Sequence, residues 1–117
     1  MSGRHFLLDT NILIALFNED QSIIEHLSKG SDTFLSSVVL GELYFGAEKS
    51  KQRKSNFEKI DRLASLLPVL ACDQDTAKHY GKIKNLLKLK GTPIPENDIW
   101  IAALVDINVL FLYKLKS

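Results

Sequence analysis

This chain of 117 residues has little cysteine and lacks several sequence features, and each of these absences argues against a class of protein. The one cysteine, Cys72, cannot form a disulfide within the chain, so a reducing cytoplasm is the expected compartment. No apolar run approaches the roughly 20 residues of a membrane-spanning helix, so we expect no membrane contact. No repeat, low-complexity segment or linker interrupts the sequence. What remains is one expected domain, residues 1–117, with the composition of a soluble globular protein.

Two common kinds of catalytic motif are also missing. The chain contains no glycine-rich phosphate loop and no Gly-x-Ser-x-Gly turn, and no histidine adjoins Cys72 in the sequence. The three histidines, His5, His26 and His79, lie far apart and lack the spacing of metal ligands. Nucleophilic catalysis and a histidine-based metal centre therefore have little support.

Apolar segments of strand length alternate with segments of helical periodicity, which predicts an α/β fold with a parallel sheet. Asp73 is expected to cap a long helix that runs through Lys90. The expected strands are His5–Leu8, Thr33–Ser36, Val69–Cys72 and Val109–Tyr113. The expected helices are Asn11–Phe17, Gln21–Ser28, the segment around Glu42, Gln52–Leu67, the helix after Asp73, and one opened by Asn97 or Asp98. The long helix carries an expected apolar stripe of Ala77, Tyr80, Ile83, Leu86 and Leu87.

Three carboxylates occupy places where a charged group is costly. Asp9 ends the apolar run of residues 6–8, Glu42 lies within the apolar helical stretch of residues 38–47, and Asp98 precedes an apolar helix. Charged groups avoid apolar surroundings unless they are paired or bind a metal, and two carboxylates ~4 Å apart repel by about 4 kcal/mol at an effective dielectric of ~20. A hard divalent cation such as Mg²⁺ removes both penalties. The three acids therefore predict a metal-dependent enzyme that acts on phosphate.

Each of these residues also has a simpler explanation. Asp9 and Asp98 could only cap helices, which is a common use of aspartate. Glu42 is harder to explain in this way, because its neighbours one helical turn away are mostly apolar. Asn11 could orient the Asp9 carboxylate, whereas Ser36 more readily starts a helix than contacts phosphate, and Thr10 could do either.

Basic residues form two clusters, although the net charge is only +1. Such clusters beside an acidic site suit a polyanion whose phosphates approach a metal, but either cluster could equally be a solvated helix face. The candidate contacts to a nucleic-acid backbone are Lys49, Lys51, Arg53, Lys54, Lys84 and Lys88.

Three segments together resemble a known family. Residues 6–14, with Asp9-Thr10-Asn11, look like the first motif of PIN-domain ribonucleases, residues 35–47 like the second, and residues 91–103 like the third. The resemblance runs from about residue 5 to residue 104, and within the family it favours the VapC toxins of VapBC toxin–antitoxin pairs. It implies a three-layer α/β/α fold with a short, mostly parallel central sheet, and an endoribonuclease that depends on Mg²⁺ or Mn²⁺. It further implies an RNA substrate, a homodimer and a VapB-like antitoxin.

The resemblance also assigns roles to individual residues. Asp9, Glu42 and Asp98 match the catalytic, metal-binding acids of the family, and Asn11 and Ser36 match accessory positions, to which we add Thr10. These roles are expectations from the match of motifs.

The chain departs from the family at its end. A fourth acidic position is missing, and Lys116 stands roughly where it is expected, so the tail resembles a truncated or frame-altered VapC terminus. We expect impaired activity from this change. Three interpretations follow: an active metal nuclease, which we favour; a degenerate toxin that binds antitoxin or itself; and a phosphotransferase with Asp9 as nucleophile. Asn11 argues against the last, because haloacid-dehalogenase-like enzymes need a second aspartate at that position.

Overall fold

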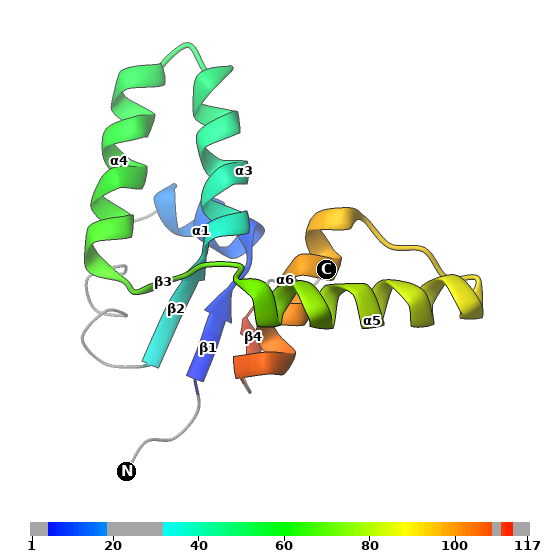
Figure 1. Ribbon diagram of the computed structural model, residues 1–117. Helices are drawn as coiled ribbons and strands as arrows, with labels where there is room; N and C mark the ends of the chain where they lie inside the picture. The colour runs from blue at the N-terminus through cyan, green and yellow to red at the C-terminus, as the bar shows by residue number, and fades with distance from the viewer. Residues whose placement is uncertain (1–4, 19–31, 109–110, 114–117) are drawn as a thin grey trace.

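A parallel sheet of four strands forms the centre of the computed structural model, which describes residues 5–18, 32–108 and 111–113. The strands are β1 (His5–Leu8), β2 (Asp32–Ser36), β3 (Val69–Leu70) and β4 (Phe111–Tyr113), in the order β3-β2-β1-β4. Every strand pair is parallel, with Leu7 opposite Phe34 and Leu112, and Ser36 opposite Leu70. The carboxyl ends of the strands therefore share one edge of the sheet (Figure 1).

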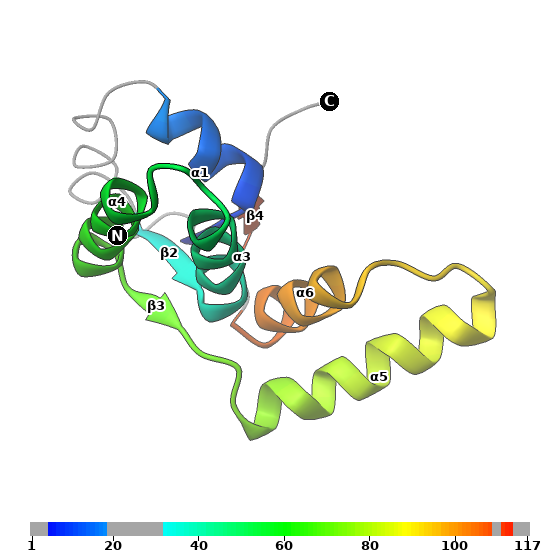
Figure 2. The same cartoon turned by 90° about the horizontal axis from the view of Figure 1, so that it is seen from above.

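Helices cover both faces of this sheet and give three layers, as predicted. They are α1 (Thr10–Phe17), α3 (Ser37–Glu48), α4 (Arg53–Leu66), α5 (Gln74–Lys90) and α6 (Glu96–Asn108). Seen from above, α1 lies on one side of the sheet, and α6 lies on the other with α5 outside it (Figure 2). The expected helix Gln21–Ser28 falls outside the described residues. Within those residues, no helix has the length and apolar character needed to cross a membrane.

The core forms where these layers meet. Leu7 and Leu8 are adjacent in β1, so their side chains point to opposite faces of the sheet, and yet both are buried. A strand covered on both faces has a continuous apolar sequence instead of an alternating one. Leu35 of β2 and Leu13 of α1 are fully buried beside them. Burial of each such leucine stabilises the fold by about 1.5–3 kcal/mol.

Helices α3 and α4 pair side by side beyond the carboxyl end of β2 (Figure 1). Val39, Leu43 and Ala47, four residues apart, form the buried stripe of α3. Ile60 and Leu63 are the buried residues of α4. The position of the α3 stripe decides which way its other residues face, and Glu42 lies next to it on a half-buried side.

Helix boundaries follow from the local sequence. Ser36 is the N-cap of α3, and its hydroxyl accepts a hydrogen bond from the Val39 backbone N–H at 2.9 Å. Asp73 caps α5, as expected, because its carboxylate accepts from the Thr76 backbone N–H and hydroxyl, both at 2.9 Å. Gly91, with a φ of 69°, ends α5 in the left-handed conformation that glycine adopts readily.

Three expectations need correction. β3 covers Val69–Leu70 and stops two residues before Cys72, and α6 begins at Glu96, ahead of both expected starts. The expected apolar stripe of α5 is only partly covered: Tyr80, Ile83 and Leu87 are half-buried, Ala77 and Leu86 are exposed, and the one buried residue of this fully described helix is Thr76. The reason is that α5 is an outer helix that packs mainly on α6, so a helical apolar pattern here did not predict burial (Figure 2).

Candidate functional site

Glu42 projects from the second turn of α3 toward the start of α1. Because Ser36 ends β2 and immediately caps α3, this part of α3 stays near the carboxyl edge of the sheet. Asp9 follows β1 at the same edge and is half-buried. Ligand sites of open parallel sheets lie at this edge. The topology therefore places Asp9 and Glu42 in the region where such a site is expected.

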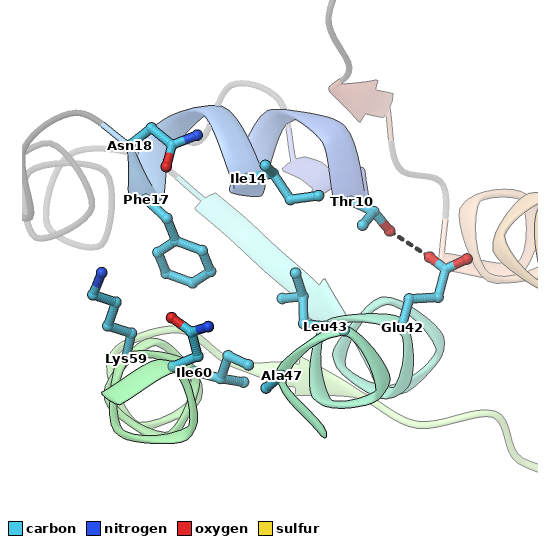
Figure 3. A pocket seen from close by; sticks show the side chains of 11 residues that line it. Thr10, Ile14, Phe17, Asn18, Glu42, Leu43, Ala47, Lys59 and Ile60 are labelled. Carbon is cyan, nitrogen blue, oxygen red and sulfur yellow. Dashed lines mark hydrogen bonds between the residues drawn. The ribbon is translucent and has the colours of Figure 1, made fainter. Parts of the chain in front are cut away.

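Both carboxylate oxygens of Glu42 have a side-chain partner. The Thr10 hydroxyl donates a hydrogen bond to Oε1 (Figure 3), and the Asn97 side-chain amide donates to Oε2 at 3.0 Å. Thr10 is 32 residues from Glu42 in sequence, and Asn97 is 55 residues away. Since Thr10 adjoins Asp9 and Asn97 adjoins Asp98, this one carboxylate connects the three acidic segments.

The fold brings the three acids into one region, but their side chains do not converge tightly enough to hold one metal ion. Asp98 is exposed on the first turn of α6, whereas Asp9 and Glu42 are half-buried. Among residues 5–18, 32–108 and 111–113, no three histidine, cysteine, aspartate or glutamate side chains are close enough to hold a metal together. The oxygen donors present, carboxylate, hydroxyl and amide, are nevertheless the type that Mg²⁺ and Mn²⁺ prefer, so the donor chemistry fits such a cation.

A cavity of about 240 Å³ opens beside Glu42 (Figure 3). Ile14 and Phe17 of α1 line one side, and Gly46 of α3 and Lys59 of α4 lie across from them. Ile14 is 46% exposed, so apolar surface is available in this groove. The groove thus combines one carboxylate, one ammonium group and apolar walls.

The structure also places Ser36 and Asn11, two other predicted site residues. Ser36 is fully buried and its hydroxyl is occupied as the α3 cap, which agrees with the helix-start interpretation. Asn11 is exposed on the first turn of α1, and its role in orienting Asp9 stays a prediction.

Two of the basic candidates, Arg53 and Lys84, are exposed and form ion pairs with acidic side chains. Arg53 makes a two-point ion pair with Glu48, at 2.8 and 3.0 Å, and Lys84 pairs with Glu96 at 2.9 Å. The guanidinium of Arg53 lowers the pKa of the Glu48 carboxyl. The remaining candidates are exposed: Lys49, Lys51, Lys54 and Lys88.

Two further residues near Glu42 were not among the predicted site residues. Asn97 was considered only as a helix start, although its position next to Asp98 could have suggested a role. Phe45 is 63% exposed one turn after Glu42, and the Lys49 ammonium lies 4.4 Å from its ring centroid. The signal that could have identified Phe45 is its spacing of three residues from Glu42, which places both on neighbouring parts of one helix surface.

The protein has a three-layer α/β/α fold with an acidic site at the carboxyl edge of its parallel sheet. Comparison with known protein families identifies the class of proteins to which this architecture belongs. The model of the family described as "PIN domain" matches residues 6–107. The chain belongs to the PIN-domain family.

Within that family the chain is similar to VapC proteins. It is 36% identical over 118 residues to ribonuclease VapC1 of Haemophilus influenzae, covering 96% of this chain and 88% of the relative. It is 37% identical over 99 residues to the tRNA(fMet)-specific endonuclease VapC of Salmonella typhimurium, covering 83% and 75%. The crystal structure of DNA-bound VapBC from Salmonella typhimurium matches with a TM-score of 0.79 and 34% identity, covering 92% of this chain and 83% of that one.

Proposed function

We propose that this protein is a VapC-like toxin, an endoribonuclease that hydrolyses RNA phosphodiester bonds with Mg²⁺ or Mn²⁺, and that the whole chain is a single PIN domain. The observation that carries the proposal is the position of Glu42, whose two oxygens bind the neighbours of Asp9 and Asp98. The similarity to proteins named ribonuclease and endonuclease supports it.

Each site residue has a chemical role in this proposal. Asp9, Glu42 and Asp98 would hold the cation, and Thr10 and Asn97 orient the Glu42 carboxylate by hydrogen bonds to its two oxygens. When bound, Mg²⁺ or Mn²⁺ lowers the pKa of a water molecule and stabilises negative charge on the phosphate.

The substrate contacts lie along α3 and beyond it. Glu42, Phe45 and Lys49 follow one another at three and four residues, so a carboxylate, an exposed ring and an ammonium group share one side of the helix. Single-stranded RNA offers unstacked bases to aromatic rings and phosphates to cations. We therefore assign base stacking to Phe45 and backbone contacts to Lys49, Lys51, Lys54 and Lys88.

A VapB-like antitoxin is the proposed regulatory partner, and a homodimer is the proposed assembly. One of the matching solved structures, from Salmonella typhimurium, is a VapBC complex. The groove beside Glu42 has apolar walls and carries the Glu42 carboxylate and the Lys59 ammonium group, which suits an apolar segment that has a basic residue for Glu42 and an acidic one for Lys59. Occupation of this groove would cover Glu42 and block the active site.

A degenerate toxin that binds its partners without cutting RNA is the second candidate. One observation favours it: no three acidic side chains of the described residues converge tightly enough to share a metal. In that case the groove would function only in binding.

One experiment separates the two candidates. A pool of tRNA and rRNA is incubated with the protein in Mg²⁺, Mn²⁺ or EDTA, beside Asp9→Ala and the control Asp75→Ala, which changes an exposed acid on α5. We expect cleavage in metal, none in EDTA, loss in Asp9→Ala and retention in Asp75→Ala. Full cleavage in EDTA would refute the metal mechanism, and a folded wild-type protein inactive under every condition would support the degenerate toxin.

A further inference from the structure

The outer helix α5 holds the first turn of α6 through a compact polar cluster. The Tyr80 hydroxyl donates a hydrogen bond to the Glu96 carboxylate, and the Lys84 ammonium lies 2.9 Å from the other oxygen of that carboxylate. Lys84 also donates to the Tyr80 hydroxyl at 3.2 Å. The Tyr80 ring stacks on Trp100, with centroids 4.1 Å apart and planes 14° apart. One turn of α5 is therefore fixed against one turn of α6.

That turn of α6 is the one that carries the proposed site residues. Asn97 and Asp98 lie between Glu96 and Trp100, and Asn97 donates to Glu42 at 3.0 Å. A path of contacts thus runs from α5 through Glu96 and Asn97 to the Glu42 carboxylate. It joins the outermost helix of the described fold to the region where the three acidic segments meet (Figure 2).

Burial does not explain how this turn is held. Residues 91–98 are all exposed, so burial contributes little to holding the loop after α5 and the first three residues of α6. The first buried residue of α6 is Ile99. The orientation of Asn97 and Asp98 therefore depends on the buried side of α6, which begins at Ile99, and on the cluster of Tyr80, Lys84 and Glu96.

Lys84 and Glu96 form the ion pair of this cluster. The ion pair is about half exposed, with side-chain exposures of 50% and 57%, and such pairs add little to global stability. Removal of the cluster should therefore disturb orientation more than folding.

We infer that Tyr80, Lys84 and Glu96 are positioning residues, which align the first turn of α6 so that Asn97 engages Glu42 and Asp98 faces the same site. This inference rests on the proposed function for its consequence in catalysis. Its geometric part, the coupling of Glu96 to Asn97, does not depend on any enzymatic activity.

The test compares Tyr80→Phe, which keeps the ring stacked on Trp100 but loses the hydroxyl, with Glu96→Gln, which keeps the shape but loses the charge. Lys78→Ala, an exposed change on α5 outside the cluster, is the control. Three quantities are measured: the side-chain amide resonance of Asn97 by NMR, assigned from its loss in Asn97→Asp; the affinity for Mn²⁺ alone; and the midpoint of thermal unfolding.

We expect both cluster variants to shift or broaden the Asn97 amide resonance and to weaken Mn²⁺ binding by about tenfold, the lower range for loss of groups that orient metal ligands. Thermal midpoints should stay close to that of the control. The double variant should weaken Mn²⁺ binding by less than the product of the single effects, because the two residues share one hydrogen bond.

Two results would overturn the inference: an Asn97 resonance unchanged in both variants, or a thermal midpoint lowered so far that the contacts are simply structural. A different pattern separates this inference from the proposed function. If the Asn97 resonance responds but the wild-type protein neither binds Mn²⁺ nor cuts RNA, the positioning role stands and the nuclease proposal fails.

Discussion

The Glu42 side chain is held by residues distant in sequence, whereas its unusual position can be recognised from its own helix. Its apolar neighbours in α3 made the charge conspicuous from sequence alone, because an acid in such a stretch needs a partner. The partners themselves, Thr10 and Asn97, belong to other helices. At the residue scale, the sequence identifies the unusual group, whereas the fold determines what it binds.

Ser36 provides a test of a structural role against an accessory role in the site. Ser36→Ala removes the acceptor for the Val39 N–H at a fully buried position, so the free energy of unfolding should fall by about 1 kcal/mol or somewhat more. Urea unfolding measures this loss, and Ser55→Ala, an exposed change near the start of α4, should have little effect. If Ser36→Ala keeps its stability but loses RNA cleavage, the hydroxyl acts in the site and not as a cap.

Phe45 and Asn97 show the limits of residue patterns: a neighbouring acid points to each residue, but their exposure and contacts are not encoded locally. The α3 segment is apolar almost all round, so periodicity does not reveal which side faces the core; the contacts with α4 and the sheet decide it, and they leave Phe45 outside. The bond from Asn97 to Glu42 spans 55 residues, and no local pattern encodes such a contact. Local signals such as the caps at Ser36 and Asp73 were, in contrast, predictable.

At the scale of elements, α5 has ends that the sequence predicts and a surface that it does not. Asp73 and Gly91 fix the ends through a side-chain cap and a left-handed residue, and both are local effects. Burial of its apolar residues depends on how many neighbours the helix has, which is a property of the whole fold. Leu86 and Leu89, 48% and 75% exposed, are the consequence.

The Asp73 cap should make part of the stability depend on pH. Hydrogen bonds from the Thr76 backbone N–H and hydroxyl lower the pKa of Asp73, so the folded state favours the ionised form. A carboxyl with a lowered pKa stabilises the fold above its unfolded pKa and loses that contribution as pH falls through the folded value.

The corresponding measurement is the difference in thermal midpoint between the wild type and Asp73→Ala. We expect a clear difference at pH 7 that shrinks below about pH 4, where aspartate protonates. Asp75→Ala, in the first turn of the same helix, is the control for a general effect of charge at the helix start. A difference that stays constant from pH 7 to pH 3 would contradict the assigned role of the ionised cap.

At the scale of the whole molecule, alternating strands and helices were enough to predict an α/β fold with a parallel sheet. The strand order β3-β2-β1-β4 was not readable from the sequence, because it depends on how the crossovers place each strand. The three-layer fold followed from the family resemblance, and the structure and the PIN-domain match confirm it.

The distribution of charged side chains gives a prediction for the salt dependence of RNA binding. Lys51 and Lys54 are exposed, whereas Arg53 between them is paired with Glu48. If the exposed lysines contact the RNA backbone, each lysine-to-glutamine change should reduce the slope of log affinity against log salt by about 0.7. Arg53→Gln should reduce it less. Binding of single-stranded RNA to the Glu42→Gln protein across salt concentrations measures this, and an unchanged slope in Lys51→Gln and Lys54→Gln would assign both lysines to a solvated surface.

The proposal that this fold assembles a metal-dependent ribonuclease around Glu42 depends most on that one carboxylate. The decisive measurement is RNA cleavage in Mg²⁺ or Mn²⁺ by Glu42→Gln beside Glu48→Gln, a matched change six residues further along the same helix at an exposed position. We predict that Glu42→Gln nearly abolishes cleavage while its circular dichroism and thermal midpoint match those of the folded wild type, and that Glu48→Gln remains active. Cleavage by Glu42→Gln at the wild-type rate would contradict the assignment of the active site.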